Sequence, residues 1–258
     1  INSIYTEGRS LVIGKFYSSA DLAFFNRGNQ FPALIVGNLN TPISNVMLPL
    51  MAEKKDSQNA LKSVLRKAMQ LSAYLVFPMM GILAACARPL VLVLLGQKWA
   101  ECVPYLQVAC LFYLFQPLQS MNWQALKAAG QGALCFKLEV IKKAISFIVL
   151  IMSIPFGVFA ISLSSAFCGF VSMLINMTPN KKVLGYGIFE QLIDVLKPSI
   201  ATLFSVVIAL LLIHISNGNL ISLIVAPLGS LGCYIVLSKL MNIEGFNLLM
   251  DKLSLRRN

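Results

Sequence analysis

The sequence is poor in the residues from which most enzyme sites are built. It contains one histidine, His214, and its six cysteines are scattered with no C-x-x-C pair. These spacings match neither a zinc site nor a cysteine–histidine nucleophile. A glycine-rich loop able to cradle phosphates is also missing, so any ATP-driven process would require another subunit. We therefore expect no enzyme activity, no metal and no cofactor.

Charge is scarce, and negative charge most of all. Only 12% of the residues are charged, with 21 basic against 10 acidic side chains, while 57% are hydrophobic and the mean hydropathy is +0.76. A soluble domain would carry about twice this charged fraction. The net charge of +11 would suggest nucleic acid in a soluble protein. Here the basic residues flank hydrophobic runs, which indicates the anionic lipid of a phospholipid bilayer as the partner, and not nucleic acid.

The positive charge alternates along the chain. Of the 21 basic residues, 16 fall in four gaps between hydrophobic runs, and the intervening gaps hold only Arg27 and Lys98. The four basic gaps are 53–67, 127–143, 179–197 and 239–258. Basic loops of multispanning membrane proteins stay on the cytoplasmic side. We therefore expect these segments, including the C-terminus, to lie in the cytoplasm.

The hydrophobic runs predict an all-α, polytopic transmembrane helical bundle, because a membrane barrel would need short alternating segments instead. About eight membrane helices fit the chain. Their expected ranges are 1–18, 30–51, 68–95, 104–126, 133–154, 158–177, 198–215 and 220–240. The first residue already lies in a helical pattern and is not Met, so we expect an N-terminal part of the protein to be missing from this chain.

Polar and proline-containing segments set the predicted helix ends. Residues 19–29 are expected to form an outside loop, and residues 56–67 an amphipathic segment at the inner surface. Pro198 suits the first turn of the seventh helix. The strictly apolar part of the fifth helix is short, so Lys142 and Lys143 are expected to extend to the inner interface.

Several short segments together resemble a known family. They are 11–18 (LVIGKFYS), 20–22, 26–28, 30–32, 34–36, 46–49, 102–107, 126–128, 138–143 and 179–182. These segments resemble polysaccharide exporters and flippases of the lipopolysaccharide biosynthesis type, such as O-antigen or exopolysaccharide exporters. That family is part of the multidrug/oligosaccharidyl-lipid/polysaccharide exporter superfamily. The similarity extends over nearly the whole chain, although no single segment is a catalytic motif.

The resemblance implies a membrane transporter of the bacterial cytoplasmic membrane. Such flippases move undecaprenyl-pyrophosphate-linked oligosaccharide or polysaccharide repeat units for cell-surface polysaccharide or lipopolysaccharide biosynthesis. They have two six-helix halves and extra C-terminal helices. By that comparison residues 1–178 form the second six-helix bundle with a truncated first helix, and residues 179–258 form a cytoplasmic loop, two additional helices and a basic tail. The missing first half and other polysaccharide-assembly proteins would be its protein partners.

Two ionisable residues fall inside the first apolar helix. Counted from the outer end at Ser18, Arg9 lies roughly 14 Å deep, near the middle of a hydrocarbon core about 30 Å thick, and Glu7 lies half a turn deeper. Arg9 is a candidate counter-charge for a lipid pyrophosphate, and Glu7 a candidate protonatable coupling group. The alternative is that each pairs with a helix of the missing half or faces water.

Two further helices carry polar faces. Asn38, Thr41 and Asn45 recur along one side of the second helix. The fourth helix carries five such residues within about 60° of one another. They are Tyr113, Gln116, Ser120, Trp123 and Lys127. Amides, hydroxyls and an aromatic ring can bind sugars, so both faces are candidate walls of a substrate cavity, with interhelical hydrogen bonding as the alternative.

Two other functions are considered beside the flippase. Cation-coupled multidrug efflux would favour a strongly acidic cavity, whereas here Arg9 and Lys127 stand against the single Glu7. A membrane polysaccharide polymerase or glycosyltransferase would need a substantial outer loop or domain with catalytic carboxylates or histidines. The outer gaps are short and hold only Asp21 and Glu101 as acids. The resemblance, and next to it this charge distribution, therefore favours the flippase.

Overall fold

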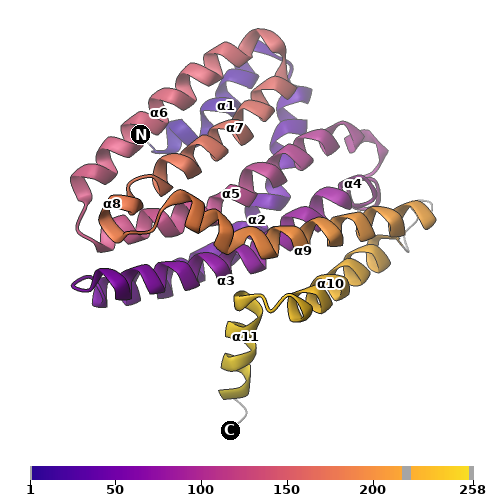
Figure 1. Ribbon diagram of the computed structural model, residues 1–258. Coiled ribbons are helices and arrows are strands. Elements are labelled where there is room, and N and C mark those ends of the chain that lie inside the picture. The colour runs from indigo at the N-terminus through magenta and orange to yellow at the C-terminus, as the bar shows by residue number, and fades with distance from the viewer. Residues whose placement is uncertain (1, 217–221, 256–258) are drawn as a thin grey trace.

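Long helices packed side by side make up the structure (Figure 1). The computed structural model describes the backbone of residues 2–216 and 222–255, and the side chains of residues 8–216 and 222–250. Every regular element within these ranges is a helix. The all-α prediction is therefore confirmed.

The elements follow one another with short connections. They are α1 (Asn2–Phe16), α2 (Ser19–Glu53), α3 (Gln58–Ala85), α4 (Ala87–Leu94), η1 (Gln97–Cys102), α5 (Val103–Ala128), α6 (Gly132–Ser153), η2 (Ile154–Phe156), α7 (Val158–Met177), α8 (Asn180–Leu184), α9 (Ile188–Ile215), α10 (Ser222–Leu240) and α11 (Glu244–Leu255). The η elements are short 3₁₀ helices. The last helix, α11, projects away from the bundle (Figure 1).

The sequence predicted an outside loop over residues 19–29, but helix α2 begins at Ser19. The predicted loop is therefore wrong. The backbone N–H of Asp21 donates to Ser18 Oγ at 3.1 Å, and the backbone N–H of Ser18 donates to the Asp21 carboxylate at 3.3 Å. This capping box satisfies two donors that the start of a helix leaves free. The polar stretch that follows therefore continues as helix, and two residues separate α1 from α2.

Helices α3 and α9 also begin earlier than predicted. Residues 56–67 do not form a separate surface segment, because most of them belong to α3, which begins at Gln58. Helix α9 begins at Ile188, so Pro198 lies in its interior and not in its first turn. Both predictions are wrong because the charged early turns of the two helices pair with each other.

The pairing between α3 and α9 is a network of charged and polar side chains. Lys62 Nζ lies 2.8 Å from a Glu190 carboxylate oxygen, and Arg66 Nη2 donates to Asp194 Oδ1 at 2.5 Å. The Tyr186 hydroxyl donates to Asp194 Oδ2 at 2.6 Å. Burial, and next to it the Asp194 carboxylate, raises the pKa of Tyr186, so the phenol keeps its proton and remains a donor. The Asp194 side chain is only 4% exposed, which makes it the centre of the network.

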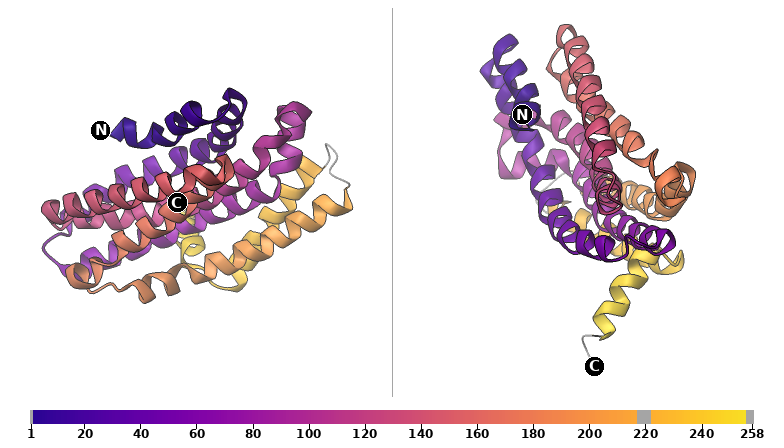
Figure 2. Two further views of the ribbon diagram at one scale, coloured as in Figure 1. Left: turned by 90° about the horizontal axis from the view of Figure 1, so that it is seen from above. Right: turned by 90° about the vertical axis from the view of Figure 1, so that its left-hand side faces the viewer.

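The turns gather at two ends of the bundle (Figure 2). At one end Gln58 Nε2 donates to the Val183 carbonyl at 3.0 Å, and Lys62 Nζ donates to the Gly185 carbonyl at 2.9 Å. The turns after α2, α5 and α7 lie at this end, which collects three of the predicted cytoplasmic segments. At the opposite end the Arg27 guanidinium stacks over the Trp99 ring, 5.0 Å from its centroid. The grouping agrees with the predicted topology, whose orientation stays a prediction.

Four stretches of the described chain are long and apolar enough to cross a membrane. They are Gln58–Ala85, Val158–Leu184, Ile188–Ile215 and Ser222–Leu240. Each includes most of a predicted span. Many large apolar side chains on α9 and α10 are exposed, as expected for helices that face lipid. The chain is therefore a multi-pass membrane protein, and the number of about eight spans remains a prediction.

Candidate functional site: a polar cavity

A polar cavity of about 460 Å³ lies among helices α1, α2, α5, α6 and α7. Its polar and charged lining residues are Arg9, Ser10, Asn26, Asn29, Tyr113, Gln116, Gln119, Glu139, Lys142, Ser165 and Ser172. Three of the residues predicted for the site, Arg9, Tyr113 and Gln116, are brought together here. Two cations and one carboxylate are among these residues, so the described lining carries a net positive charge.

Arg9 reaches the cavity from α1, and the described residues use only part of its hydrogen-bonding capacity. Its Nη2 donates to Ser146 Oγ on α6 at 3.2 Å. Its Nε is buried and has no hydrogen-bond partner within the described part of the chain. Tyr17 directly follows α1, and its hydroxyl donates to the carbonyl of Ile154, which directly follows α6, so α1 lies alongside α6. A buried, unsatisfied guanidinium N–H is costly unless a ligand or water occupies it.

Lys142 also lines the cavity, which corrects the expectation that it extends to the inner interface. Its Nζ lies 2.6 Å from Glu139 Oε1 on the same helix, and its side chain is only 10% exposed. The same ammonium lies over the Trp123 ring of α5, 4.5 Å from the centroid. Lys127 Nζ lies 5.4 Å from the same centroid. One indole ring therefore contacts two lysines, of which Lys142 lines the cavity and Lys127 is exposed.

Side chains of the predicted polar face of α5 have different surroundings. Tyr113 and Gln116 line the cavity, and within the described residues their hydroxyl and amide groups make no hydrogen bond. Ser120 instead donates to Asn40 Oδ1 on α2 at 3.1 Å, which is the interhelical bonding that the sequence left open. Together with Trp123 and Lys127, these residues extend from the cavity to the basic end of the helix.

The remaining predicted site residues lie elsewhere. Asn38, Thr41 and Asn45 are exposed on α2 and do not line the cavity. Among the described residues, none of the three has a hydrogen-bond partner. The side chain of Glu7 lies outside the described residues. The exposed face of α2 thus stays a candidate wall only for a cavity shared with another segment.

Sequence reasoning missed the contribution of α6. Glu139 and Lys142 are an i, i+3 pair of opposite charge, and Ser146 follows one turn later. The three residues share one face of the helix at 100° per residue. An ion pair beside an apolar helix segment is a known indication of an interior site, and this signal could have identified the pair.

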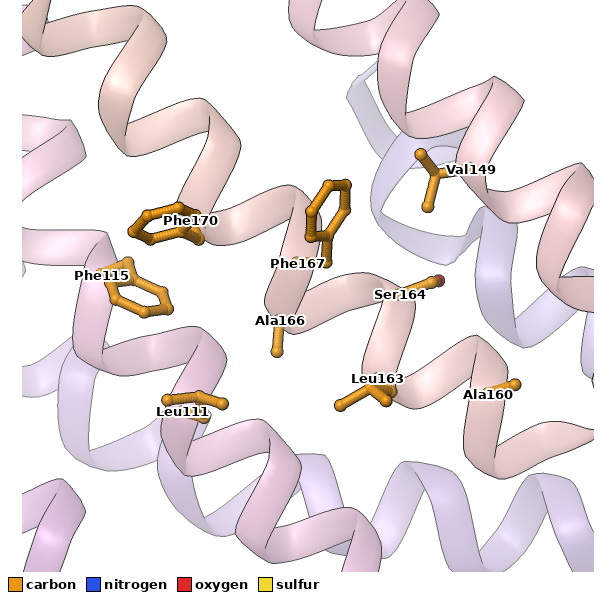
Figure 3. A pocket seen from close by; sticks show the side chains of 9 residues that line it. All are labelled: Leu111, Phe115, Val149, Ala160, Leu163, Ser164, Ala166, Phe167 and Phe170. Atoms are coloured by element: carbon orange, nitrogen blue, oxygen red, sulfur yellow. The ribbon is translucent and has the colours of Figure 1, made fainter.

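A second hollow, of about 550 Å³, lies beside α5, α6 and α7 and is apolar (Figure 3). Leu111 and Phe115 of α5 and Leu163, Phe167 and Phe170 of α7 line it. The one polar lining residue donates its hydroxyl to its own helix, since Ser164 Oγ lies 2.7 Å from the Ile161 carbonyl. Among the described residues that line this hollow, none offers a free polar group for sugars or phosphates, unlike the cavity that contains Arg9.

Part of the chain is similar to a known protein family. Residues 1–104 match the family described as "Polysaccharide biosynthesis protein". The matched part is less than half of the 258 residues, and over this part the chain is similar to polysaccharide biosynthesis proteins. This match confirms the resemblance seen in the sequence. The matched residues include α1, α2 and the helices that follow as far as η1.

Curated relatives come from different bacteria. The chain is 24% identical over 126 residues to the teichuronic acid biosynthesis protein TuaB of Bacillus subtilis. It is 27% identical over 135 residues to the succinoglycan biosynthesis transport protein ExoT of Rhizobium meliloti, and 23% identical over 142 residues to the lipopolysaccharide biosynthesis protein WzxC of Escherichia coli. The matches include 49, 52 and 55% of this chain but only 26, 27 and 29% of the relatives.

A solved structure shares the fold. The lipid II flippase MurJ in its inward closed conformation superimposes with a TM-score of 0.76 at 15% sequence identity. The match includes 92% of this chain and 51% of that chain. The helical bundle therefore has the fold of about half of that solved chain.

Proposed function

We propose that the chain is part of a flippase that moves lipid-linked oligosaccharide or polysaccharide repeat units across a membrane. The observation that carries the proposal is the polar cavity, into which Arg9 brings a buried N–H that has no partner among the described residues. A guanidinium suits the oxygens of a phosphate, and the amides and hydroxyls beside it suit sugars. The relatives named for polysaccharide biosynthesis and transport support the same substrate class.

In the proposed mechanism the chain supplies one of two walls. Residues 1–178 form the second helical half, and residues 179–258 add the loop, the helices α9 and α10 and the basic tail. A first half, outside this chain, covers the exposed polar face of α2, and the two halves rock about a midplane site. Arg9 holds the phosphates of the lipid carrier, which we take to be undecaprenyl pyrophosphate. Tyr113 and Gln116 hydrogen-bond to the sugars.

The proposed location is the bacterial cytoplasmic membrane, with the basic turns and the C-terminus in the cytoplasm. The gathering of the turns after α2, α5 and α7 at one end supports this orientation, because basic loops resist translocation. Other polysaccharide-assembly proteins would act before and after the flippase. Multidrug efflux is less well supported, because the described cavity residues carry more positive than negative charge.

Replacement of Arg9 tests the proposal. Arg9→Ala in the complete natural protein should abolish surface glycan in a flippase-deficient strain while leaving the amount of membrane-inserted protein unchanged. Arg9→Lys should rescue only in part, because an ammonium keeps the charge but loses the bidentate fork. Lys15→Ala is the matched control, since Lys15 is an exposed cation of the same helix.

Glycan display and protein level must be measured together. If Arg9 only paired with a structural partner, the Ala variant would lower protein abundance, because a buried counter-charge would be left alone. Normal glycan from Arg9→Ala at normal abundance would remove Arg9 from the site and refute the proposal.

A further inference from the structure

We propose that Lys142 is a second phosphate-binding residue, held by Glu139 and Trp123 until a diphosphate displaces Glu139. The inference rests on the proposed function and adds a residue to it: Lys142, released from Glu139, makes the cavity bind a lipid diphosphate more tightly than a lipid monophosphate. It starts from Lys142 itself, which lines the cavity with a side chain that is only 10% exposed.

Arg9 and Lys142 are close enough to share one ligand. Arg9 Nη2 is bonded to Ser146 Oγ, and Ser146 is four residues after Lys142 on α6. Four residues are one helical turn, a rise of about 6 Å. Both side chains line the same cavity of about 460 Å³. Arg9 and Lys142 can therefore each bind one of the two linked phosphate groups of a diphosphate. A single phosphate group needs only one of the two cations.

The partners of Lys142 in this structure are replaceable. Glu139 is 37% exposed, and it contacts Lys142 from the same helix at 2.6 Å. The Trp123 ring attracts the ammonium only modestly, 4.5 Å from the centroid. A diphosphate carries more negative charge than one carboxylate and can bind Lys142 and Arg9 at once, so it can displace Glu139. The indole ring stays beside the ammonium and limits its movement.

The experiment measures binding of short lipid phosphates to the complete natural protein in detergent. The probes are farnesyl diphosphate and farnesyl monophosphate, with glucuronic acid added as a competitor, because a sugar carboxylate could also use Lys142. The variants are Lys142→Gln, Lys142→Arg, Glu139→Gln and Arg9→Ala, with Lys127→Gln as the control because Lys127 contacts the same ring but does not line the cavity. Size-exclusion profiles establish that each variant is folded.

Lys142→Gln should raise the dissociation constant of farnesyl diphosphate about tenfold and change that of the monophosphate by less than about twofold. Lys142→Arg should restore the preference for diphosphate. Glu139→Gln should tighten diphosphate binding by at least about threefold, because a competing carboxylate is removed. Arg9→Ala should weaken the binding of both probes, and Lys127→Gln should change the binding of neither probe.

An unchanged diphosphate preference in folded Lys142→Gln, with both probes lost in Arg9→Ala, would overturn this inference and leave the proposed function standing. Competition by glucuronic acid that disappears in Lys142→Gln would assign the residue to a sugar carboxylate instead, and so would also overturn it. Absence of saturable binding of either farnesyl probe by the unmodified protein would refute the proposed function as well.

Discussion

The crossing of α2 and α5 depends on Gly28, and replacement of this residue tests the described packing. A Cβ atom at Gly28 would lie 2.7 Å from Tyr105 Cβ and 2.8 Å from the backbone nitrogen of Leu106. Because one of these atoms belongs to the backbone, rotation of a side chain cannot relieve the contact, and the two helices must move apart. Both helices carry cavity residues, so we expect Gly28→Ala to reduce stability and transport together.

The magnitude follows from two opposing effects. Alanine in place of glycine favours a helix by about 1 kcal/mol, whereas inserting a methyl group into a tightly packed contact costs about 1–3 kcal/mol. Gly232→Ala is the matched control, since Gly232 also lies within a helix and a Cβ there meets nothing within 4 Å. Both variants gain the same helix propensity, so this gain cancels when their free energies of unfolding are subtracted. The difference of about 1–3 kcal/mol is then the cost of the close contact at Gly28.

The assay is the apparent melting temperature of the complete natural protein in detergent, read as the fraction that stays monodisperse in size-exclusion chromatography after heating. For a domain of about 150–250 residues, each kcal/mol corresponds to roughly 2–4 °C. Gly28→Ala should therefore melt about 2–12 °C below Gly232→Ala. Equal melting temperatures would refute the close approach of α2 and α5.

Two further predictions concern the charged end of the bundle. Asp194→Asn should lower the free energy of unfolding by roughly 1–3 kcal/mol, less than for a fully buried pair because the Arg66 side chain is 45% exposed. The same melting assay checks it, with Glu53→Gln as the control for an exposed pair with Lys54. Single cysteines at Ser57 and Lys181, in a cysteine-free background, should resist a membrane-impermeant maleimide in intact cells, whereas one at Phe156 should react. The opposite labelling pattern would invert the predicted topology.

The fold class could be predicted from the sequence because it depends on a property of whole segments. Apolar runs flanked by basic gaps allow few structures other than membrane helices, and no contact between distant residues is needed to recognise them. The helix ends were harder to predict. The start of α2 was readable in principle, since Ser18 and Asp21 have the spacing of a capping box.

The starts of α3 and α9 depend on contacts between residues far apart in sequence. Lys62 and Arg66 on α3 are each 128 residues away from their partners Glu190 and Asp194. Charged residues beside an apolar run are equally typical of a loop, and only the pairing partner decides between loop and helix. A single sequence does not contain that information, so the interior position of Pro198 could not be foreseen.

Some residues of the candidate site follow from local properties of the sequence, and others depend on contacts with distant helices. Arg9 was identified from its depth in an apolar helix, which is a local property. Tyr113 and Gln116 were identified from their shared face on α5, and that periodicity also included Ser120, which bonds to α2 instead. Helical spacing indicates which residues share a face, but not which part of that face borders a cavity and which part contacts another helix.

Lys142 was expected at the inner interface because it lies at the end of a short apolar run, but it lines the cavity instead. A lysine at the end of a short apolar run can extend to the interface or turn into a polar interior, and both avoid contact with lipid. The residues around it distinguish the two, because Glu139, Lys142 and Ser146 recur at i, i+3 and i+7 and so form one polar stripe on α6. A residue that only extends to the interface needs no polar neighbours on its own face. The stripe therefore indicates a wall of a cavity. It continues along α6 to Ser146, whose hydroxyl accepts a hydrogen bond from Arg9 of α1.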